Sequence, residues 1–328
     1  MTKRNLIIVH RGPEYERDFQ EIAERIRTLD AKIDVFVCDP RSFSSLAKSV
    51  WERPVFILAL IGNPFVFPRG AILQSKQIDK VVQMRMAAAE GIAVPPSLPF
   101  RFGMWLDPIV FGDFVIIKPR DVRLMSNGEG IHLFRRLRLQ TLKPDYFPGD
   151  HPIFKDKVGY MVQRYIDQGQ YPTYNRVLTF LGQPIYMASG RRTEARPDLS
   201  SQDEIIESCN ITIQGGPRER RWGVDDDIRE LAIRVAKCFS RVPLLAIDII
   251  REEKTGRPFF LECNPGGNTW HFSSNQPGGI KIRMVIGEAD KFGKARALEL
   301  GRTRMIEQTG AFDIVAAALV DETRARAV

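Results

Sequence analysis

Two carboxylates and a carboxamide lie close together in the last third of the chain, where they could hold a metal ion. The run FFLECN ends with Glu262 and Asn264, and the earlier run LLAIDII carries Asp248. The intervening EKTGRP is typical of a hairpin turn, and a turn about Thr255 places Asp248 opposite Glu262. Because strand side chains alternate between faces, Asn264 then lies on the same face as Glu262. Oxygen ligands of these kinds suit a hard ion such as Mg²⁺.

The opposite face of this hairpin is predicted to be apolar, since Ile247, Ile249, Leu261 and Cys263 alternate with the polar residues. On the polar face the two carboxylates would lie directly opposite each other, which is unfavourable. Either solvent or a cation between them would relieve the repulsion. We favour the cation, and this prediction depends on the register, because a slip of one residue would undo the pairing.

A second group of residues could bind an anion such as phosphate. Lys118 follows the apolar run FVII, and a charge that leaves a buried strand favours a directed role over a lysine that reaches to solvent. In SNGEGI, Gly128 and Gly130 let backbone N–H groups approach phosphate oxygens, and Ser126 and Asn127 add donors. The same loop could be a flexible hairpin turn, and the two interpretations are compatible. The chain contains no GxxxxGK[ST] phosphate-binding loop.

The composition is that of an ordinary globular protein, with 44% hydrophobic and 27% charged residues, so intrinsic disorder is not expected. No apolar run approaches the roughly 20 residues of a membrane helix, and the N-terminal run LIIV is too short for a secretory signal. We therefore expect a cytoplasmic protein that does not enter a membrane. The four cysteines are far apart, and neither they nor the four histidines form a zinc-binding pattern.

The net charge of +8 indicates an anionic partner. Nucleic acid, a nucleoside triphosphate or a carboxylate substrate would each match this charge. We interpret the basic runs FRRLR and RERR as solvated surface, so the charge alone does not choose among these partners.

The elements that must position these residues follow from the spacing of apolar side chains. Over residues 1–61, short runs rich in β-branched residues alternate with helical patterns, which predicts a small parallel sheet flanked by helices. A helix over 75–91 follows. The next predicted elements are four strands and a helix, over 112–119, 160–166, 175–182, 183–189 and 225–240. The C-terminal DETRARAV is predicted to be a frayed tail.

These motifs occur in the order found in the ATP-grasp superfamily, which the sequence resembles over about residues 76–270. Members of this superfamily include D-alanine–D-alanine ligase, glutathione synthetase and ribosomal-protein glutamate ligases. The resemblance is carried by QIDKVVQMRMAAAEGIAVPPS, FVIIKPRD, SNGEGI, MVQRYI, NRVLTFLGQPIYMASGRR and AIDII…FFLECNPGG. It implies an α/β N-terminal domain followed by an α+β ATP-grasp fold, whose two subdomains grip ATP between them.

The resemblance also implies where the domains begin and end. The N-terminal domain would comprise residues 1–75, and the ATP-grasp domain residues 76–290. Within the latter, a lid subdomain would span about 97–163. Residues 291–328 would form a C-terminal helical segment and tail.

Individual roles follow from the same resemblance. Asp248, Glu262 and Asn264 would hold Mg²⁺ or Mn²⁺. Arg176 and one of Arg191 and Arg192 would stabilise the transferring phosphoryl group or an acyl-phosphate oxyanion. The residues that would contact the nucleotide are Lys80, Lys118, Ser126, Asn127, Gly128, Gly130, Gln163, Arg164, Tyr165, Ile166 and Asn175.

Two departures from the superfamily pattern concern the ends of the site. Gln163 or Gln170 stands where many members have an acidic residue that contacts the adenine amine or the ribose, so an amide or Asn175 must make this contact here. Trp270 and His271 follow the metal motif where small or apolar residues are usual. They could shape an acceptor pocket, or Trp270 could pack in the core with His271 at its rim.

The activity implied is that of an ADP-forming carboxylate–amine ligase, with ATP and Mg²⁺ or Mn²⁺ as cofactors. A carboxylate would be activated as an acyl phosphate and then attacked by an amine or thiol, with small molecules or a peptide as substrates. An ATP-grasp kinase and a nucleotide-binding regulator without turnover stay open as alternatives. A basic nucleic-acid binder is the least favoured, and the sequence leaves a homo-oligomer open.

Overall fold

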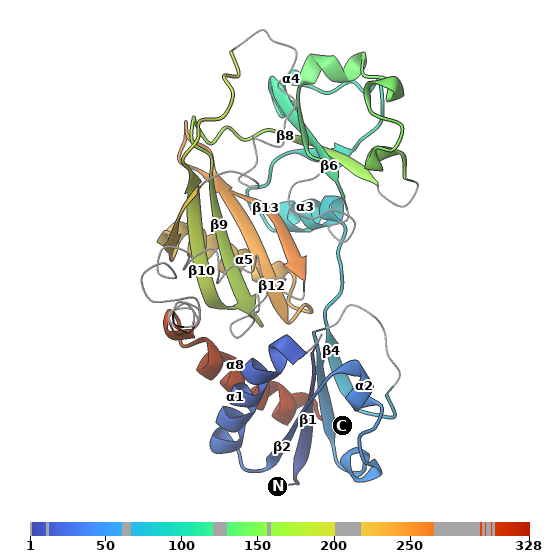
Figure 1. Cartoon of the computed structure of the whole chain (residues 1–328), viewed down its shortest axis with the longest axis vertical. Helices are drawn as coiled ribbons and strands as arrows, with labels where there is room; N and C mark the ends of the chain where they lie inside the picture. The colour runs from blue at the N-terminus through green and yellow to red at the C-terminus, as the bar shows by residue number, and fades with distance from the viewer. Residues whose placement is uncertain are drawn as a thin grey trace.

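The structure of the protein is a computed structural model (Figure 1). It describes residues 2–10, 13–60, 67–120, 130–155, 159–200, 218–265 and 306–328, together with positions 296, 299 and 303. Figure 1 shows three units along the long axis of the molecule, with the N-terminal unit at one end and the unit that carries β6 and β8 at the other. Among the described residues, no helix is long and apolar enough to span a bilayer.

The N-terminal unit is a parallel sheet in the order β2-β1-β3-β4. Its strands are β1 (Arg4–Val9), β2 (Ile33–Cys38), β3 (Val55–Ala59) and β4 (Ala71–Gln74), and its helices are α1 (Pro13–Leu29) and the short α2 (Pro40–Phe43), with a 3₁₀ turn at Lys48–Glu52. The strands are apolar on both faces, as parallel strands covered on both sides require. The predicted α/β unit is confirmed, with β4 as a strand that the sequence did not indicate.

The C-terminal helix α8 (Ala311–Arg326) returns to this unit and packs beside α1 (Figure 1). The prediction of a frayed tail is wrong. The helix continues to Arg326, and Val328 then exchanges two backbone hydrogen bonds with Val55 of β3. Arg324 is anchored to Asp30 by an ion pair of 2.9 Å. Pairing with the first residue of β3 therefore orders a segment whose polar composition alone indicates no order.

The second unit is an antiparallel sheet in the order β5-β8-β6-β7. It consists of β5 (Ser97–Pro99), β6 (Phe114–Pro119), β7 (His132–Arg135) and β8 (Tyr160–Arg164), with the short helix α4 (Pro108–Phe111) and 3₁₀ turns at Arg136–Gln140, Pro144–Tyr146 and Pro152–Phe154. One face carries an aromatic core that includes Phe111, Phe134 and Phe147. Val115 and Ile117 of β6 point into this core, so the alternation of the strand directs Lys118 to the opposite face.

The third unit is an antiparallel sheet in the order β11-β10-β9-β12-β13. Its strands are β9 (Thr173–Phe180), β10 (Gln183–Arg192), β11 (Arg218–Trp222), β12 (Leu244–Arg251) and β13 (Pro258–Pro265). Helices α3 (Lys80–Ala89) and α5 (Asp226–Cys238) pack against one face, where Val177, Ile247 and Ile249 are fully buried. The other face contributes Leu178 and Leu244 to the core that it shares with α1 and α8. Together, the two antiparallel sheets confirm the predicted α+β architecture.

Candidate functional site

The hairpin of β12 and β13 has the predicted register. Asp248 lies directly opposite Glu262, and Asn264 lies opposite Ala246 two positions along the same face. Asp248 also lies opposite Arg176 of β9, on its other side. The polar face of three adjacent strands therefore presents two carboxylates, an amide and a guanidinium side by side.

A β-bulge next to Asp248 changes the hairpin beyond this point. The register shifts by one residue, so that Ile249 lies opposite Phe260. The prediction that Leu261 shares the apolar face with Ile247 and Ile249 is wrong, because Phe260 fills that place in the core. Leu261 packs instead with a different cluster that contains Ile166. The bulge thus places an apolar side chain immediately before Glu262, outside the core under α3 and α5.

Arg176 and Asp248 form a two-pronged ion pair. Arg176 Nε donates to Asp248 Oδ1 at 2.6 Å, and Arg176 Nη2 donates to Asp248 Oδ2 at 2.7 Å. Asn264 Nδ2 also donates to Asp248 Oδ2, at 3.2 Å. Such a parallel arrangement fixes both planes, so the guanidinium and the carboxylate hold each other in a defined orientation. Because Asn264 Nδ2 faces Asp248, the amide oxygen of Asn264 points away from this carboxylate.

Lys80 forms the second ion pair of the site. Its Nζ lies 2.7 Å from Glu262 Oε2, and the Lys80 and Glu262 side chains are 9% and 18% exposed. Lys80 is the first residue of α3, whose N-terminus is capped by Asp79. A lysine at this end is disfavoured by the helix dipole, so the nearby carboxylate of Glu262 compensates an otherwise unfavourable position.

Lys118 is the third cation of the site. It is only 4% exposed, and no hydrogen bond or ion pair joins its ammonium group to another described residue. Burial lowers the pKa of Lys118 to about 8, with a further lowering from Lys80, while Glu262 and Asp248 act in the opposite direction. These influences place the ammonium group among the charged side chains of the third unit, although Lys118 belongs to the second.

The described part of the site therefore holds three cations against two carboxylates, Asp248 and Glu262. Burial opposes ionisation of Glu262, but Lys80 and Lys118 outweigh it and lower the pKa of Glu262 to about 2. The carboxylate is thus charged at neutral pH, and among the residues that the structure describes one positive charge of the site remains uncompensated in a mostly buried position. A buried charge without a partner is costly. The arrangement is therefore suited to an anionic ligand.

The donor set also fits a hard divalent cation. Asp248, Glu262 and Asn264 offer only oxygen ligands on one face of the hairpin, and Mg²⁺ is commonly held by one or two carboxylates, with water and phosphate as its other ligands. No cluster of three or more histidine, cysteine, aspartate or glutamate side chains able to hold a metal occurs in the described ranges. A cation here would therefore depend on a bound anion for further ligands.

The structure separates the two neighbouring arginines of β10. Arg192 is 4% exposed and lies on the same face as Arg176, since Arg176 pairs with Ala188 and alternation brings Arg192 to the same side. Its Nη2 donates to Glu194 at 3.1 Å. Arg191 lies on the other face, where its guanidinium carbon Cζ is 5.0 Å from the centroid of the Tyr171 ring. Of this pair, only Arg192 is brought to the side of the site.

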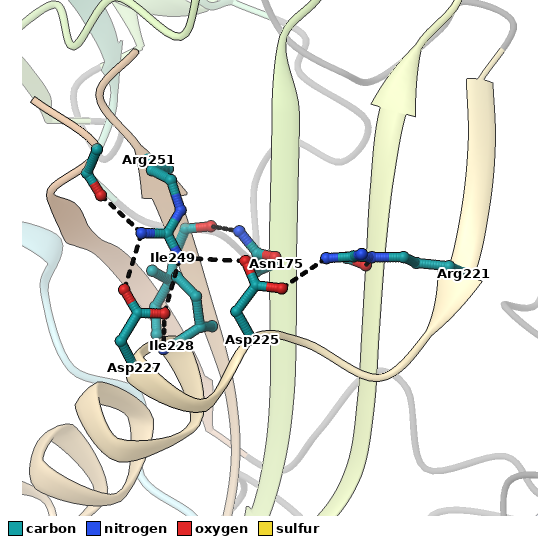
Figure 2. A network of polar contacts seen from close by, with 9 residues as sticks. Asn175, Arg221, Asp225, Asp227, Ile228, Ile249 and Arg251 are labelled. Atoms are coloured by element: carbon teal, nitrogen blue, oxygen red, sulfur yellow. Dashed lines mark hydrogen bonds and ion pairs between the residues drawn. The ribbon is translucent and has the colours of Figure 1, made fainter. Parts of the chain in front are cut away.

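Asn175 is also directed away from the charged group. It lies opposite Ile249 on the face that α5 covers, and its Nδ2 donates to Ile249 O at 3.3 Å. Figure 2 shows this bond together with Arg251, which binds Asp225 and Asp227 at the start of α5. The structure therefore does not bring Asn175 to Arg176 and Asp248.

The segment Gln163–Ile166 joins the second unit to the third. The Gln163 amide is buried and donates to Ser97 Oγ at 2.9 Å. The N–H groups of Arg164 and Tyr165 donate to Pro96 O and Phe114 O, so the backbone of these two residues can offer a ligand only its carbonyl groups. The N–H of Ile166 makes no backbone bond within the described ranges. Among Arg164, Tyr165 and Ile166 it is therefore the backbone donor that remains available to a ligand.

Several predicted residues lie outside the described ranges, namely Ser126, Asn127, Gly128, Trp270 and His271. Gly130, at the end of the predicted phosphate loop, is described and has a φ of 70°. This left-handed conformation favours glycine. One contact beside the predicted metal ligands was not indicated by the sequence. Gln83 of α3 bonds to the backbone of Cys263, between Glu262 and Asn264, from a position 180 residues away in the chain.

The sequence matches no protein-family model and no curated protein. Among solved structures, the chain is similar to the D-cycloserine synthetase DcsG, with 15% identity, a TM-score of 0.48 and coverage of 96% of this chain and 99% of that chain. A D-alanine–D-alanine ligase from Bacillus anthracis complexed with ATP has 12% identity and a TM-score of 0.42, with coverage of 98% and 99%.

The ATP-grasp ligase PsnB, complexed with a minimal precursor, has 16% identity and a TM-score of 0.44, with coverage of 84% of this chain and 96% of that chain. The chain is thus similar over most of its length to these three enzymes of known structure.

Proposed function

We propose that the protein is an ATP- and magnesium-dependent ligase that activates a carboxylate as an acyl phosphate for attack by an amine or thiol. The observation that carries this proposal is the excess of one buried positive charge, with Lys80, Lys118 and Arg176 facing Asp248 and Glu262. A triphosphate supplies the missing negative charge. Residues of α3, of the second unit and of the third unit meet here, so nucleotide binding would draw these units together.

Different groups of the protein would contact the phosphates, the adenine ring and the metal ion of the nucleotide. Lys80 and Lys118 neutralise phosphate oxygens, and the N–H of Ile166 is available to the edge of the adenine ring. Leu261 and Ile166 provide an apolar surface beside the charged group, which suits a flat base. Asp248, Glu262 and Asn264 would hold Mg²⁺, which supplies further charge neutralisation of the triphosphate when bound.

The chemistry then proceeds in two displacements. An oxygen of the substrate carboxylate attacks the γ-phosphorus, the bond from this phosphorus to the bridging oxygen breaks, and ADP leaves. The amine nitrogen next attacks the acyl carbon, the bond to the phosphate oxygen breaks, and the ammonium proton is lost. Arg176, oriented by Asp248, and the buried Arg192 lie on the face where the phosphoryl oxygens develop charge.

The test is a screen for ADP release over amino acids and small carboxylates, alone and with amine acceptors, in the presence of Mg²⁺. A ligase releases ADP and phosphate and yields an amide or thioester only when both substrates are present. A phosphorylated alcohol would instead indicate a kinase. Binding of ATP with no product from any pair would indicate a regulator, and would overturn the ligase.

A further inference from the structure

Gln83 of α3 forms a paired contact with the backbone of β13. Cys263 N donates to Gln83 Oε1 at 2.8 Å, and Gln83 Nε2 donates to Cys263 O at 2.9 Å. The Gln83 side chain is fully buried, and its Nε2 also donates to Ile78 O at 2.9 Å. The amide therefore uses both ends of its side chain on a single residue of the strand.

The position of β13 explains why this contact exists. The strand lies at the edge of the third sheet, with β12 on one side. The outward N–H and C=O groups of Cys263 would otherwise have no strand to pair with. Gln83 takes the place of the missing strand at this one residue. Buried backbone groups left unpaired are unfavourable, so the contact stabilises this edge.

The contact also lies at a particular point in the site. Cys263 stands between Glu262 and Asn264, and Gln83 follows Lys80 by three residues, on the next turn of the same helix. One amide thus joins the helix that presents Lys80 to the strand that presents two oxygen ligands. The 2.7 Å ion pair of Lys80 and Glu262 joins the same helix and strand.

We propose that Gln83 is a positioning residue for the metal–nucleotide site, which holds Glu262 and Asn264 in place relative to Lys80. The inference rests on the proposed function. Without the paired contact, the edge of β13 can move against α3 and the two ligands lose their common alignment. The affinity for metal-bound nucleotide should fall, while the contacts that Lys118 makes with metal-free nucleotide should persist.

The chain provides a matched control on the same sheet. Gln308 makes the same paired contact with Met187 of β10, since Met187 N donates to Gln308 Oε1 and Gln308 Nε2 donates to Met187 O, both at 2.8 Å. Met187 lies opposite Val177 on the face away from the charged group. Gln83→Met and Gln308→Met therefore each remove a paired contact with one strand residue, one at the site and one remote from it. Gln83→Met also removes the bond to Ile78 O, and Met187 O keeps its bond from Gly223 N in Gln308→Met.

The experiment measures binding of ATP with Mn²⁺ by electron paramagnetic resonance, and of ATP with EDTA by calorimetry, alongside the melting temperature. Both variants should melt below the wild type. Only Gln83→Met should weaken the Mn²⁺-dependent binding, by about tenfold or more, with metal-free binding unchanged. Equal metal-dependent binding in the two variants, or an equal loss with and without metal, would overturn the positioning role.

A second variant and the binding of ATP by the wild type separate failure of the positioning role from failure of the proposed function. If Gln83→Met does not fold, Gln83→Glu replaces it, because the carboxylate keeps the acceptor for Cys263 N–H and loses only the donor. Its metal-dependent binding should then be weaker than that of Gln308→Met. If the wild type binds no ATP in any condition, the proposed function itself fails. If the wild type binds ATP normally and Gln83 has no effect, the positioning role alone fails.

Discussion

The ammonium group of Lys80 and the carboxylate of Glu262 form a 2.7 Å ion pair across the junction of α3 and β13. Asp248 is held in the same way by Arg176. Both carboxylates that would serve a metal ion are therefore engaged by cations of the protein itself. A divalent ion has to compete with these cations, unless the phosphates of a nucleotide take them over.

Replacement of Lys80 by methionine tests this competition. Lys80→Met frees Glu262, so we expect the affinity for Mn²⁺ alone to rise by about tenfold, the equivalent of one ion pair worth about 1.4 kcal/mol. The affinity for ATP with Mn²⁺ should fall, because a phosphate contact is lost. Electron paramagnetic resonance of free Mn²⁺ measures both constants. Lys118→Met is the control, since it removes a neighbouring charge that is not ion-paired to either carboxylate. Unchanged Mn²⁺ binding in Lys80→Met would argue against competition.

The affinity for nucleotide should decrease as the pH rises through about 8, the lowered pKa of the buried Lys118. Phosphate binds the ammonium form, so each pH unit above this value should weaken binding by up to about tenfold. Calorimetric titrations of ATP between pH 7 and 10 measure the slope. Lys118→Arg should bind without it, because a guanidinium stays charged throughout. The same slope in Lys118→Arg would assign the titration to another group.

The same pKa shift has an opposite sign for stability. Between about 8 and the ordinary lysine value of about 10.4, the unfolded chain binds more protons than the folded chain. The free energy of unfolding contributed by Lys118 should therefore increase with pH over this window. Nucleotide binding and stability are thus expected to change in opposite directions as the pH rises.

Acid should destabilise the second unit through a histidine pair. His132 Nε2 lies 3.0 Å from His151 Nε2, and His151 Nδ1 accepts from Ile153 N at 3.1 Å. His151 therefore donates to an unprotonated His132. Burial, and then His151, lower the pKa of His132 to about 4, whereas the pKa of a histidine in an unfolded chain is about 6.5. Between these values the unfolded chain binds more protons, so the free energy of unfolding falls as the pH is lowered.

Urea unfolding at pH 7 and pH 5 measures this loss. The drop in midpoint between the two pH values should be smaller in His132→Gln than in the wild type, because the variant has no histidine to protonate at this position. An equal drop in both proteins would show that His132 does not contribute. The two proteins differ only at this position, so the difference between their drops in midpoint reports on the His132–His151 pair.

The sequence was sufficient to predict the centre of the site because local rules decide it. The turn of the hairpin and the alternation of side chains place Asp248 opposite Glu262, and the structure has this register. The sequence neighbours of Lys118 also predicted that its charge is directed into the molecule rather than to solvent, and Lys118 is buried. In both cases, the residues that determine the outcome are close together in the chain.

The features that the sequence did not indicate depend on distant partners. The bulge before Glu262 follows from the packing of Phe260 in the core under α3 and α5, which no pattern within β13 reveals. Gln83 reads as a polar position on a helix until Cys263 is placed beside it. The C-terminal helix continues to Arg326, and Val328 then pairs with Val55, at the opposite end of the chain. Tertiary contacts override local preference in each case.

Calorimetric titration of ATP into the wild type, with Mg²⁺ and again with EDTA, tests the central claim most directly. The uncompensated cation and the oxygen ligands predict binding at a single site, which Mg²⁺ strengthens and which Glu262→Gln makes insensitive to Mg²⁺. Absence of ATP binding in both conditions would contradict the account, as would binding that is the same with Mg²⁺, with EDTA and in Glu262→Gln.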